Sequence, residues 1–197
     1  MIIEAAASSG ATAKLWLVRH AQPLVEAGIC YGASDIDADQ GATRQVAASL
    51  ALTLPQGIQI LSSPLRRCRQ LALDLTEQRP DLASQSEPRL AEMNFGCFEG
   101  QLWSDIPEAH IAQWTANFGD WRFGGIESVQ DVMQRVAAVW DETMARQQDV
   151  VWLTHAGVIR AVNLISAGVR TVSRADQWPA TAIKFGEVQT FELPRLP

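Results

Sequence analysis

The chain has 197 residues, of which 47% are hydrophobic, so it is long enough to bury one sizeable core within the usual size of a single domain. Its formal net charge of −6 argues against nucleic acid or an anionic membrane as a main partner, because both require a basic surface. The three cysteines form no CxxC pair, so neither a disulfide framework nor a zinc knuckle is indicated, and a cytoplasmic protein is expected.

The first 13 residues lack the basic flank and the apolar run of a signal peptide. No stretch of the chain approaches the roughly 18 apolar residues of a membrane span. We therefore expect residues 1–13 to form a flexible tail. Since no repeat, charge block or low-complexity linker divides the remainder, residues 14–197 are predicted to form one domain.

Apolar runs alternate with helical patterns in the first part of the chain. Residues 14–18 (KLWLV) are rich in β-branched and aromatic side chains, as in a buried parallel strand, and Arg19 and His20 follow directly. Apolar residues have helical spacing from about Asp39 to Leu54, and a second predicted strand covers residues 58–61. The two basic residues therefore lie at the carboxyl end of the first strand.

The second predicted strand leads into a turn at residues 62–64 (SSP). Pro64 suits the first turn of the helix that follows, because its missing N–H would be unpaired there. Residues 66–78 carry an apolar helical face. The next region, residues 80–125, has scattered aromatic residues among Gly and Pro, so we expect an irregular excursion over the sheet.

The last part of the chain repeats the alternation. The clearest helical pattern runs from Ser128 to about Arg146, and residues 149–154 form a buried strand that ends at His155. A helix is predicted over residues 157–165, and one or two edge strands over residues 181–193. This order of elements predicts an α/β fold with an open, mostly parallel sheet, whose ligands bind at the carboxyl ends of the strands.

Four fragments follow strands or lie in the excursion: residues 17–21 (LVRHA), 62–67 (SSPLRR), 90–100 (LAEMNFGCFEG) and 154–160 (THAGVIR). In this order and spacing the chain resembles the histidine phosphatase (phosphoglycerate mutase-like) superfamily over nearly its whole length beyond the tail. The resemblance implies a single catalytic domain with helices on both faces of the sheet and the excursion over the active site.

The resemblance also implies roles for five residues. His20 would accept the phosphoryl group, while Arg19, Arg67 and His155 would surround it and Glu92 would be the proton donor. Guanidinium groups can hold the non-bridging oxygens of a phosphoryl group, and an imidazole is a nucleophile only when its attacking nitrogen is unprotonated. The nearby arginines would disfavour the imidazolium form.

No cofactor is implied. The sequence has no HxxxH pair or clustered acidic and histidine spacing that would hold a metal ion, and no GxxxxGK loop. We therefore predict a metal-independent phosphomonoester hydrolase, with a small phosphomonoester as its partner; a homo-oligomer is not excluded.

The chain departs from the family pattern at three positions. Ala21 and Ala156 replace glycines, which is tolerated unless the backbone φ is positive, and Glu26 replaces a residue that is often Asn. A carboxylate would repel phosphate, so Glu26 is expected to point away or lie in a different loop. Glu99 is either a second acid or a structural anchor, with the anchor favoured.

Several side chains are left open by the pattern. The family spacing selects Arg67 rather than Arg66, although helical geometry alone does not distinguish them. Cys30 and Cys97 lie in turn-like segments where partial exposure is expected. The tryptophans of the excursion either form the floor of a substrate pocket or anchor it to the core, namely Trp103, Trp114 and Trp121.

The segments 22–23 (QP) and 30–35 (CYGASD) resemble the α-ribazole phosphatase branch of the cobalamin pathway more than the glycolytic mutases. We therefore name α-ribazole 5′-phosphate as the candidate substrate. Two alternatives stand beside it: a phosphohistidine protein phosphatase, and a catalytically dead phosphate-binding protein.

Overall fold

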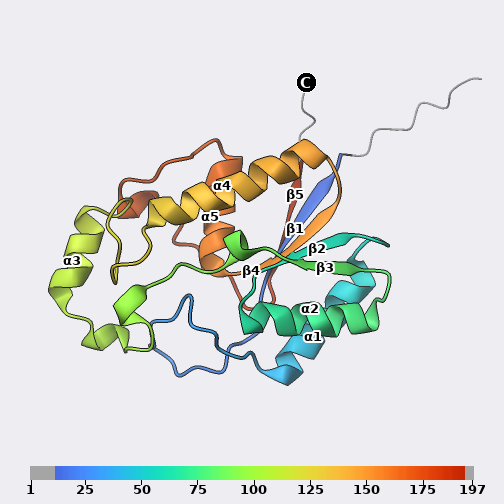
Figure 1. Cartoon of the computed structure of the whole chain (residues 1–197), viewed down its shortest axis with the longest axis horizontal. Helices are drawn as coiled ribbons and strands as arrows, with labels where there is room; N and C mark the ends of the chain where they lie inside the picture. The colour runs from blue at the N-terminus through green and yellow to red at the C-terminus, as the bar shows by residue number, and fades with distance from the viewer. Residues whose placement is uncertain (1–11, 194–197) are drawn as a thin grey trace, which may run out of the picture.

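The computed structural model describes residues 12–193 (Figure 1). Of the predicted tail, residues 1–11 lie outside this range. The strands are β1 (Lys14–Arg19), β2 (Gln59–Ser62), β3 (Ala83–Ser86), β4 (Val150–Thr154) and β5 (Val188–Glu192). The α-helices are α1 (Gln40–Thr53), α2 (Arg66–Gln78), α3 (Glu108–Ala116), α4 (Val129–Arg146) and α5 (Ala156–Ser166). No helix in the described range is both long and apolar enough to cross a membrane.

The strands form one sheet in the order β3-β2-β4-β1-β5. β1 pairs in parallel with β4, β4 with β2, and β2 with β3, whereas β5 runs antiparallel to β1 at the edge. The predicted mostly parallel α/β sheet is confirmed. The carboxyl ends of its parallel strands lie on the same side of the sheet, where a ligand site is expected.

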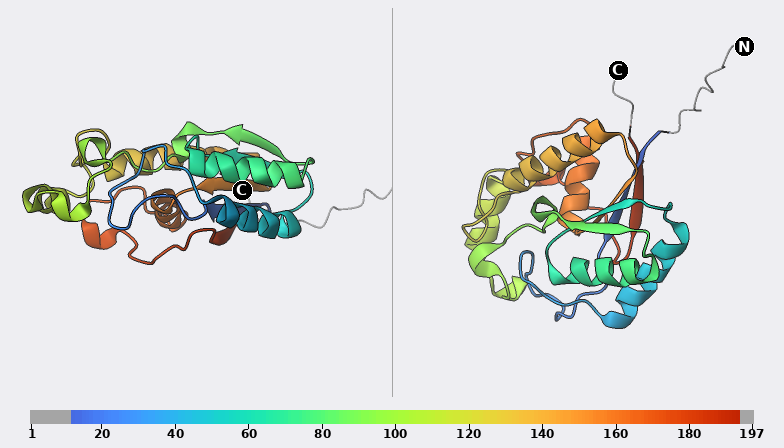
Figure 2. Two further views of the ribbon diagram at one scale, coloured as in Figure 1. Left: turned by 90° about the horizontal axis from the view of Figure 1, so that it is seen from below. Right: turned by 45° about the vertical axis from the view of Figure 1, so that its right-hand side comes forward.

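Helices cover both faces of the sheet, as Figure 2 shows from two sides. Leu17 and Trp152 point to the face covered by α4 and α5, whereas Val18 and Leu153 point to the face covered by α1 and α2. Successive side chains of a strand alternate between faces, so the continuous apolar runs of β1 and β4 follow from burial on both sides.

Side-chain caps fix the starts of two helices. The Asp39 carboxylate accepts a hydrogen bond from the N–H of Ala42 at the start of α1. At the start of α4, Ser128 and Asp131 form a reciprocal capping box. These contacts satisfy backbone donors that have no partner inside the helix.

The prediction for Pro64 is wrong, because α2 begins at Arg66 and is capped by Leu65. The backbone N–H of Ser63 still donates to the carbonyl of Leu153, at 2.9 Å. The chain thus remains bonded to β4 for one residue past β2, and Pro64 lies in the turn before the helix.

The excursion, residues 80–125, contains two regular elements that the sequence does not indicate. β3 has the sequence ASQS and all four residues are exposed, so it lacks the apolar signature of a strand. α3 has no fully buried residue, although Ile111 and Trp114 are partly buried against the core. α3 lies at the left end of the molecule in Figure 1, away from the sheet.

Candidate active site

The two predicted histidines meet at the carboxyl ends of neighbouring strands. β1 pairs with β4 so that Arg19 lies opposite Thr154, and His20 and His155 follow these two residues. The backbone N–H of His20 donates to the carbonyl of Thr154 at 3.0 Å, and the ring centroids of the histidines are 5.1 Å apart. Parallel pairing therefore places both rings side by side.

Arg67 lies between the two rings. Its Nε–H is 3.2 Å from Nε2 of His20 and 3.2 Å from Nδ1 of His155, and its side chain is fully buried. We call His20, Arg67 and His155 the histidine cluster. Arg66, by contrast, is exposed and pairs with Asp35 and Asp37. The two adjacent arginines thus point to different environments.

The hydrogen bonds of His20 define its tautomer. Nδ1 is 2.7 Å from the carbonyl oxygen of Ala21, which can only accept, so Nδ1 carries the proton. Nε2 faces the N–H of Arg67, which can only donate, so Nε2 keeps its lone pair. Burial, together with Arg67 and Arg19, lowers the pKa of His20 to about 3. The ring is therefore neutral at physiological pH.

His155 is neutral for the same physical reasons. Burial and the charge of Arg67 lower its pKa well below the usual value. Nδ1 accepts from Arg67, so Nε2 carries the proton and donates to the hydroxyl of Ser63, 2.7 Å away. The thiol of Cys68 lies 3.5 Å from the same nitrogen, and burial raises its pKa to about 12. Cys68 packs here as a neutral thiol.

The loop at residues 32–34 holds the other end of Arg67. Its Nη2 donates to the carbonyl of Gly32 at 2.6 Å, and its Nη1 donates to the carbonyl of Ser34 at 2.8 Å. A side chain on Gly32 would place Cβ 1.9 Å from the carbonyl of Met93, so this tight approach requires glycine. All three nitrogens of the guanidinium thus have partners.

Glu99 anchors the same loop from the opposite side. Its carboxylate accepts the backbone N–H groups of Gly32, Ala33 and Ser34 and that of Phe95, at 2.9 to 3.1 Å. Burial acts to raise the pKa of Glu99, but these hydrogen bonds and that of the Ser34 hydroxyl bring it below its usual value. Glu99 is therefore the structural anchor rather than a second acid.

Arg19 is partly buried and packs on the ring of Phe185. Its guanidinium carbon lies 3.8 Å from the centroid of the Phe185 ring, and its Nη1 donates to the carbonyl of Ile183 at 2.5 Å. Its buried Nε has no hydrogen-bond partner among the described residues. Burial lowers the pKa of Arg19, the charge of Glu92 opposes this shift, and Arg160 adds to it.

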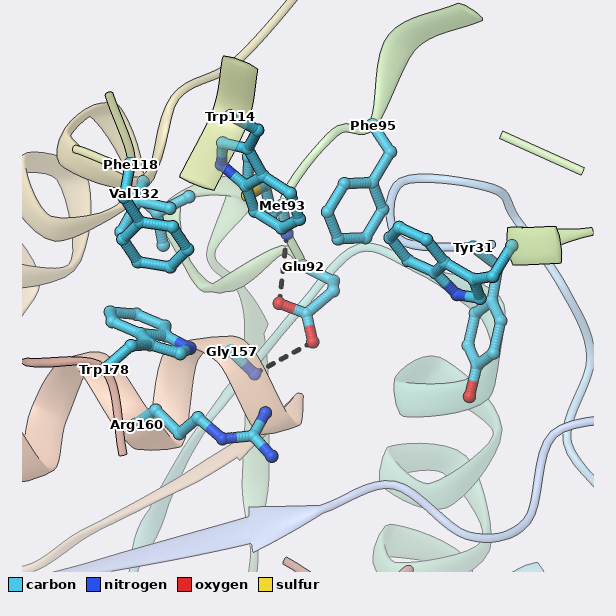
Figure 3. A pocket seen from close by; sticks show the side chains of 12 residues that line it. Tyr31, Glu92, Met93, Phe95, Trp114, Phe118, Val132, Gly157, Arg160 and Trp178 are labelled. Carbon is cyan, nitrogen blue, oxygen red and sulfur yellow. Dashed lines mark hydrogen bonds between the residues drawn. The ribbon is translucent and has the colours of Figure 1, made fainter. Parts of the chain in front are cut away.

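Glu92 reaches the site from the excursion. Its carboxylate accepts the backbone N–H of Met93 at 3.0 Å and that of Gly157 at 2.9 Å, in the first turn of α5 (Figure 3). A Cβ on residue 157 would lie 2.2 Å from the Glu92 carboxylate. Glycine at this position therefore lets the carboxylate approach the helix N-terminus.

The sequence of the chain is similar to that of known phosphatases. A sequence model of the histidine phosphatase superfamily (branch 1) matches residues 15–181. A glucosyl-3-phosphoglycerate phosphatase of Mycobacterium tuberculosis is 31% identical over 183 residues, which cover 85% of this chain and 79% of that relative. The chain belongs to the histidine phosphatase superfamily. It is accordingly a phosphomonoester hydrolase.

Solved structures agree with this family fold. The mycobacterial glucosyl-3-phosphoglycerate phosphatase Rv2419c matches with a TM-score of 0.76 at 23% identity, covering 91% of this chain and 90% of that chain. TTHB049 from Thermus thermophilus matches with a TM-score of 0.69 at 27% identity, covering 92% of this chain and 95% of that chain. These likenesses confirm the predicted phosphoglycerate mutase-like fold, but none of them selects the α-ribazole phosphatase branch.

The departures from the histidine phosphatase pattern create no backbone strain. Among residues 12–193 the only non-glycine residue with a positive φ is Gln147, so Ala21 and Ala156 have ordinary φ values. Both alanines are buried. Glu26 is exposed to solvent.

A cavity of about 240 Å³ opens beside Glu92. We call it the aromatic pocket, because six aromatic side chains line it: Tyr31, Phe95, Trp103, Trp114, Phe118 and Trp178. Trp103 and Trp114 also stack on the buried Phe123, so they both line the pocket and anchor the excursion. Trp121 does not line it.

Sequence reasoning missed several contributors to the site of this histidine phosphatase. Arg160 lines the aromatic pocket, and its position three residues after Gly157 on one helix face was an available signal. Ser63 and Tyr31 lie within the segments 62–67 and 30–35 that resemble known phosphatases, but the pattern assigns a role to neither. Cys30 is buried, contrary to the expectation of partial exposure, because its backbone bonds to Gln101 and Gly100 draw it beneath the excursion.

Proposed function

We propose that the chain hydrolyses a small phosphomonoester in two steps, with His20 carrying the phosphoryl group between them. The observation that carries this proposal is the tautomer of His20, whose Nε2 has a lone pair in a neutral, buried ring. An imidazole in this state is a competent nucleophile without prior loss of a proton. Residues 14–197 act as one catalytic domain in this proposal.

In the first step, Nε2 of His20 forms a bond to phosphorus while the bond from phosphorus to the alcohol oxygen breaks. The electron pair of that bond stays on the alcohol oxygen, which takes a proton from Glu92. The guanidinium groups of Arg67 and Arg19 donate to phosphoryl oxygens, and His155 lies beside the transferred group. Charge that spreads over the oxygens is thereby offset.

In the second step, a water molecule attacks the phosphohistidine. Glu92, now a carboxylate, takes a proton from this water as the new bond to phosphorus forms. The bond between phosphorus and Nε2 breaks, and its electron pair returns to His20. One carboxyl group thus serves as acid and then as base, which restores the starting state.

Substitution of His20 tests the proposal. The substrate carries a radiolabel on its phosphorus, and the reaction is quenched in alkaline detergent, in which phosphohistidine survives. The wild type should then retain label on His20. His20→Ala should lose both the label and turnover, whereas His110→Ala, which changes an exposed histidine, should keep both. Label on a serine, or turnover by His20→Ala, would contradict the assignment.

The proposal requires no metal ion, because the guanidinium groups of Arg19 and Arg67 supply the positive charge. The part of the chain that the structure describes has no group of three or more His, Cys, Asp or Glu side chains suited to hold one. Turnover should therefore be the same before and after dialysis against EDTA.

Two substrates are candidates. The segments 22–23 and 30–35 favour α-ribazole 5′-phosphate, whereas the mycobacterial relative is named for glucosyl-3-phosphoglycerate. A rate panel with both esters distinguishes them. The free thiols of Cys30, Cys68 and Cys97 support a cytoplasmic location, where such esters are metabolised.

The alternatives are less well supported by the site. A protein phosphatase acting on phosphohistidine needs an open site, whereas the excursion contributes Glu92 and four of the six aromatic side chains of the aromatic pocket. A binding protein without catalysis would be favoured by strain at Ala21 or Ala156, and neither has a positive φ. Small-ester hydrolysis therefore remains our proposal.

A further inference from the structure

The side chains that line the aromatic pocket determine which alcohol part of a substrate can bind there. Glu92, the proton donor of the proposed function, is itself one of the residues that line this pocket. A proton donor must lie within hydrogen-bond reach of the oxygen that it protonates. The ester oxygen therefore lies at the Glu92 end, and the rest of the alcohol extends into the pocket.

The pocket surrounds this position with rings. In Figure 3, Phe118 and Trp178 lie on one side of the Glu92 carboxylate, and Phe95 and Tyr31 lie on the other. The volume of about 240 Å³ exceeds the about 150 Å³ of a cavity that binds benzene in another protein. One aromatic ring, or two fused rings, would fit between these walls.

Few of the side chains that line the pocket are charged. Apart from the tryptophan N–H groups and the Tyr31 hydroxyl, the polar side chains that line it are Glu92 and Arg160, both labelled in Figure 3. A sugar ring carries several hydroxyl groups, and burying these without partners is unfavourable. An apolar ring has no such requirement.

We propose that the alcohol of the natural substrate carries an aromatic ring. This ring binds in the aromatic pocket, between Trp178 on one side and Phe95 and Tyr31 on the other. This inference rests on the proposed function, since it uses Glu92 to place the ester oxygen. Aromatic rings gain from stacked and edge-to-face contacts with one another beyond their burial. The chemical class is thus an arylalkyl phosphate.

Two esters of primary alcohols provide the test, because their leaving groups have similar reactivity. Benzyl phosphate should have a kcat/KM at least roughly 30-fold above that of glucose 6-phosphate, the scale expected for burying one aromatic ring. Equal values, or a preference for glucose 6-phosphate, would overturn the inference.

Two tryptophan variants assign any preference to the pocket. Trp178 and Trp121 are both half-buried and pack against the same core, but only Trp178 lines the aromatic pocket. Trp178→Ala should lower kcat/KM for benzyl phosphate about tenfold, on the scale of a lost aromatic contact, and leave glucose 6-phosphate within about twofold. Trp121→Ala should leave kcat/KM unchanged for both esters. A loss with both esters in Trp178→Ala would count against the inference.

Benzylphosphonate separates failure of this inference from failure of the proposed function, because its carbon–phosphorus bond is not hydrolysed. It should bind to the wild type and about tenfold more weakly to Trp178→Ala, again on the scale of one aromatic contact. Such binding without turnover of any ester would refute the proposed function and retain the pocket assignment. Suppose instead that both esters are turned over at the same rate and that benzylphosphonate binds equally to the wild type and to Trp178→Ala. This result would refute the pocket assignment and retain the proposed function.

Discussion

The histidine cluster and the aromatic pocket are adjacent, yet they are built in different ways. In the cluster, both ring nitrogens of His20 and of His155 and all three nitrogens of Arg67 have partners. On the pocket side, the buried Nε of Arg160 has no partner within the described chain. The cluster is thus preorganised before substrate arrives, whereas the pocket keeps a buried donor without a protein partner.

In our proposal, the histidine cluster carries out the reaction and the aromatic pocket selects the substrate. Groups that are fixed by their own protein contacts need no reorganisation during reaction, so they suit phosphoryl transfer. Aromatic walls with few polar groups make demands on shape and polarity instead. Mutations in the two regions should therefore change different kinetic quantities.

The largest expected effect comes from breaking the cluster at its centre. Arg67→Ala removes the contacts to both histidines and should cost about 2–4 kcal/mol in transition-state stabilisation, measured from kcat/KM, as for a lost preorganised donor. Arg66→Ala removes only exposed ion pairs and should cost less than about 1 kcal/mol. Equal losses in the two variants would show that the cluster is not the reacting centre.

Glu92 belongs to both regions, so its substitution sharpens the comparison. Glu92→Gln keeps the shape but cannot exchange a proton, and turnover of an alkyl phosphate should fall by roughly 10². With p-nitrophenyl phosphate, whose leaving group barely needs a proton, the loss in the first step should be smaller, and a burst of nitrophenol is expected. If both substrates lose the same factor, Glu92 is not the proton donor.

The neutral histidines should make stability depend on pH. The folded-state pKa of His20 is about 3, below the usual 6.5, so between these values the unfolded chain binds more protons and stability falls as pH falls. From pH 7 to pH 5 this one ring should cost about 2 kcal/mol in the free energy of unfolding. Urea titrations should show a smaller pH dependence in His20→Gln. An unchanged dependence would mean that His20 titrates normally.

The smallest effect tests how far the anchoring of the cluster matters. Glu99→Gln replaces two acceptor oxygens by one and presents N–H donors to the backbone N–H groups of residues 32–34. Arg67 should then be held less firmly, with a loss of about tenfold in kcat and little change in KM, on the scale of a misplaced supporting contact. Glu26→Gln, at an exposed carboxylate, is the control. A pure KM effect would contradict a positioning role.

The sequence predicts the elements whose burial leaves a periodic pattern. β1 and β4 are continuous apolar runs because they are covered on both faces, and α4 has a complete apolar stripe. β3 and α3 have no such pattern, since neither has a buried residue. β3 is placed by its pairing with β2, and α3 by the stacking of Trp114 on Phe123, and the local apolar spacing encodes neither interaction.

The same limit applies to the site. His20 and His155 could be found because each directly follows a strand, and their pairing follows from sheet order. The backbone carbonyls of Gly32 and Ser34 that hold Arg67 could not be found, because any residue has a carbonyl. What distinguishes this loop is its close approach to Met93, which depends on the folded chain.

The pairing of β5 with β1 has a practical consequence. The N–H of Leu193 donates to the carbonyl of Ala13 at 2.7 Å, so these two residues lie side by side at the amino end of β1. His20 lies beyond the opposite end of that strand, about 20 Å away at the usual rise per residue of a strand. An affinity handle or a surface attachment at either of these two residues would therefore lie far from His20. The same holds for a loop that joins residue 193 to residue 13 in a circular permutant.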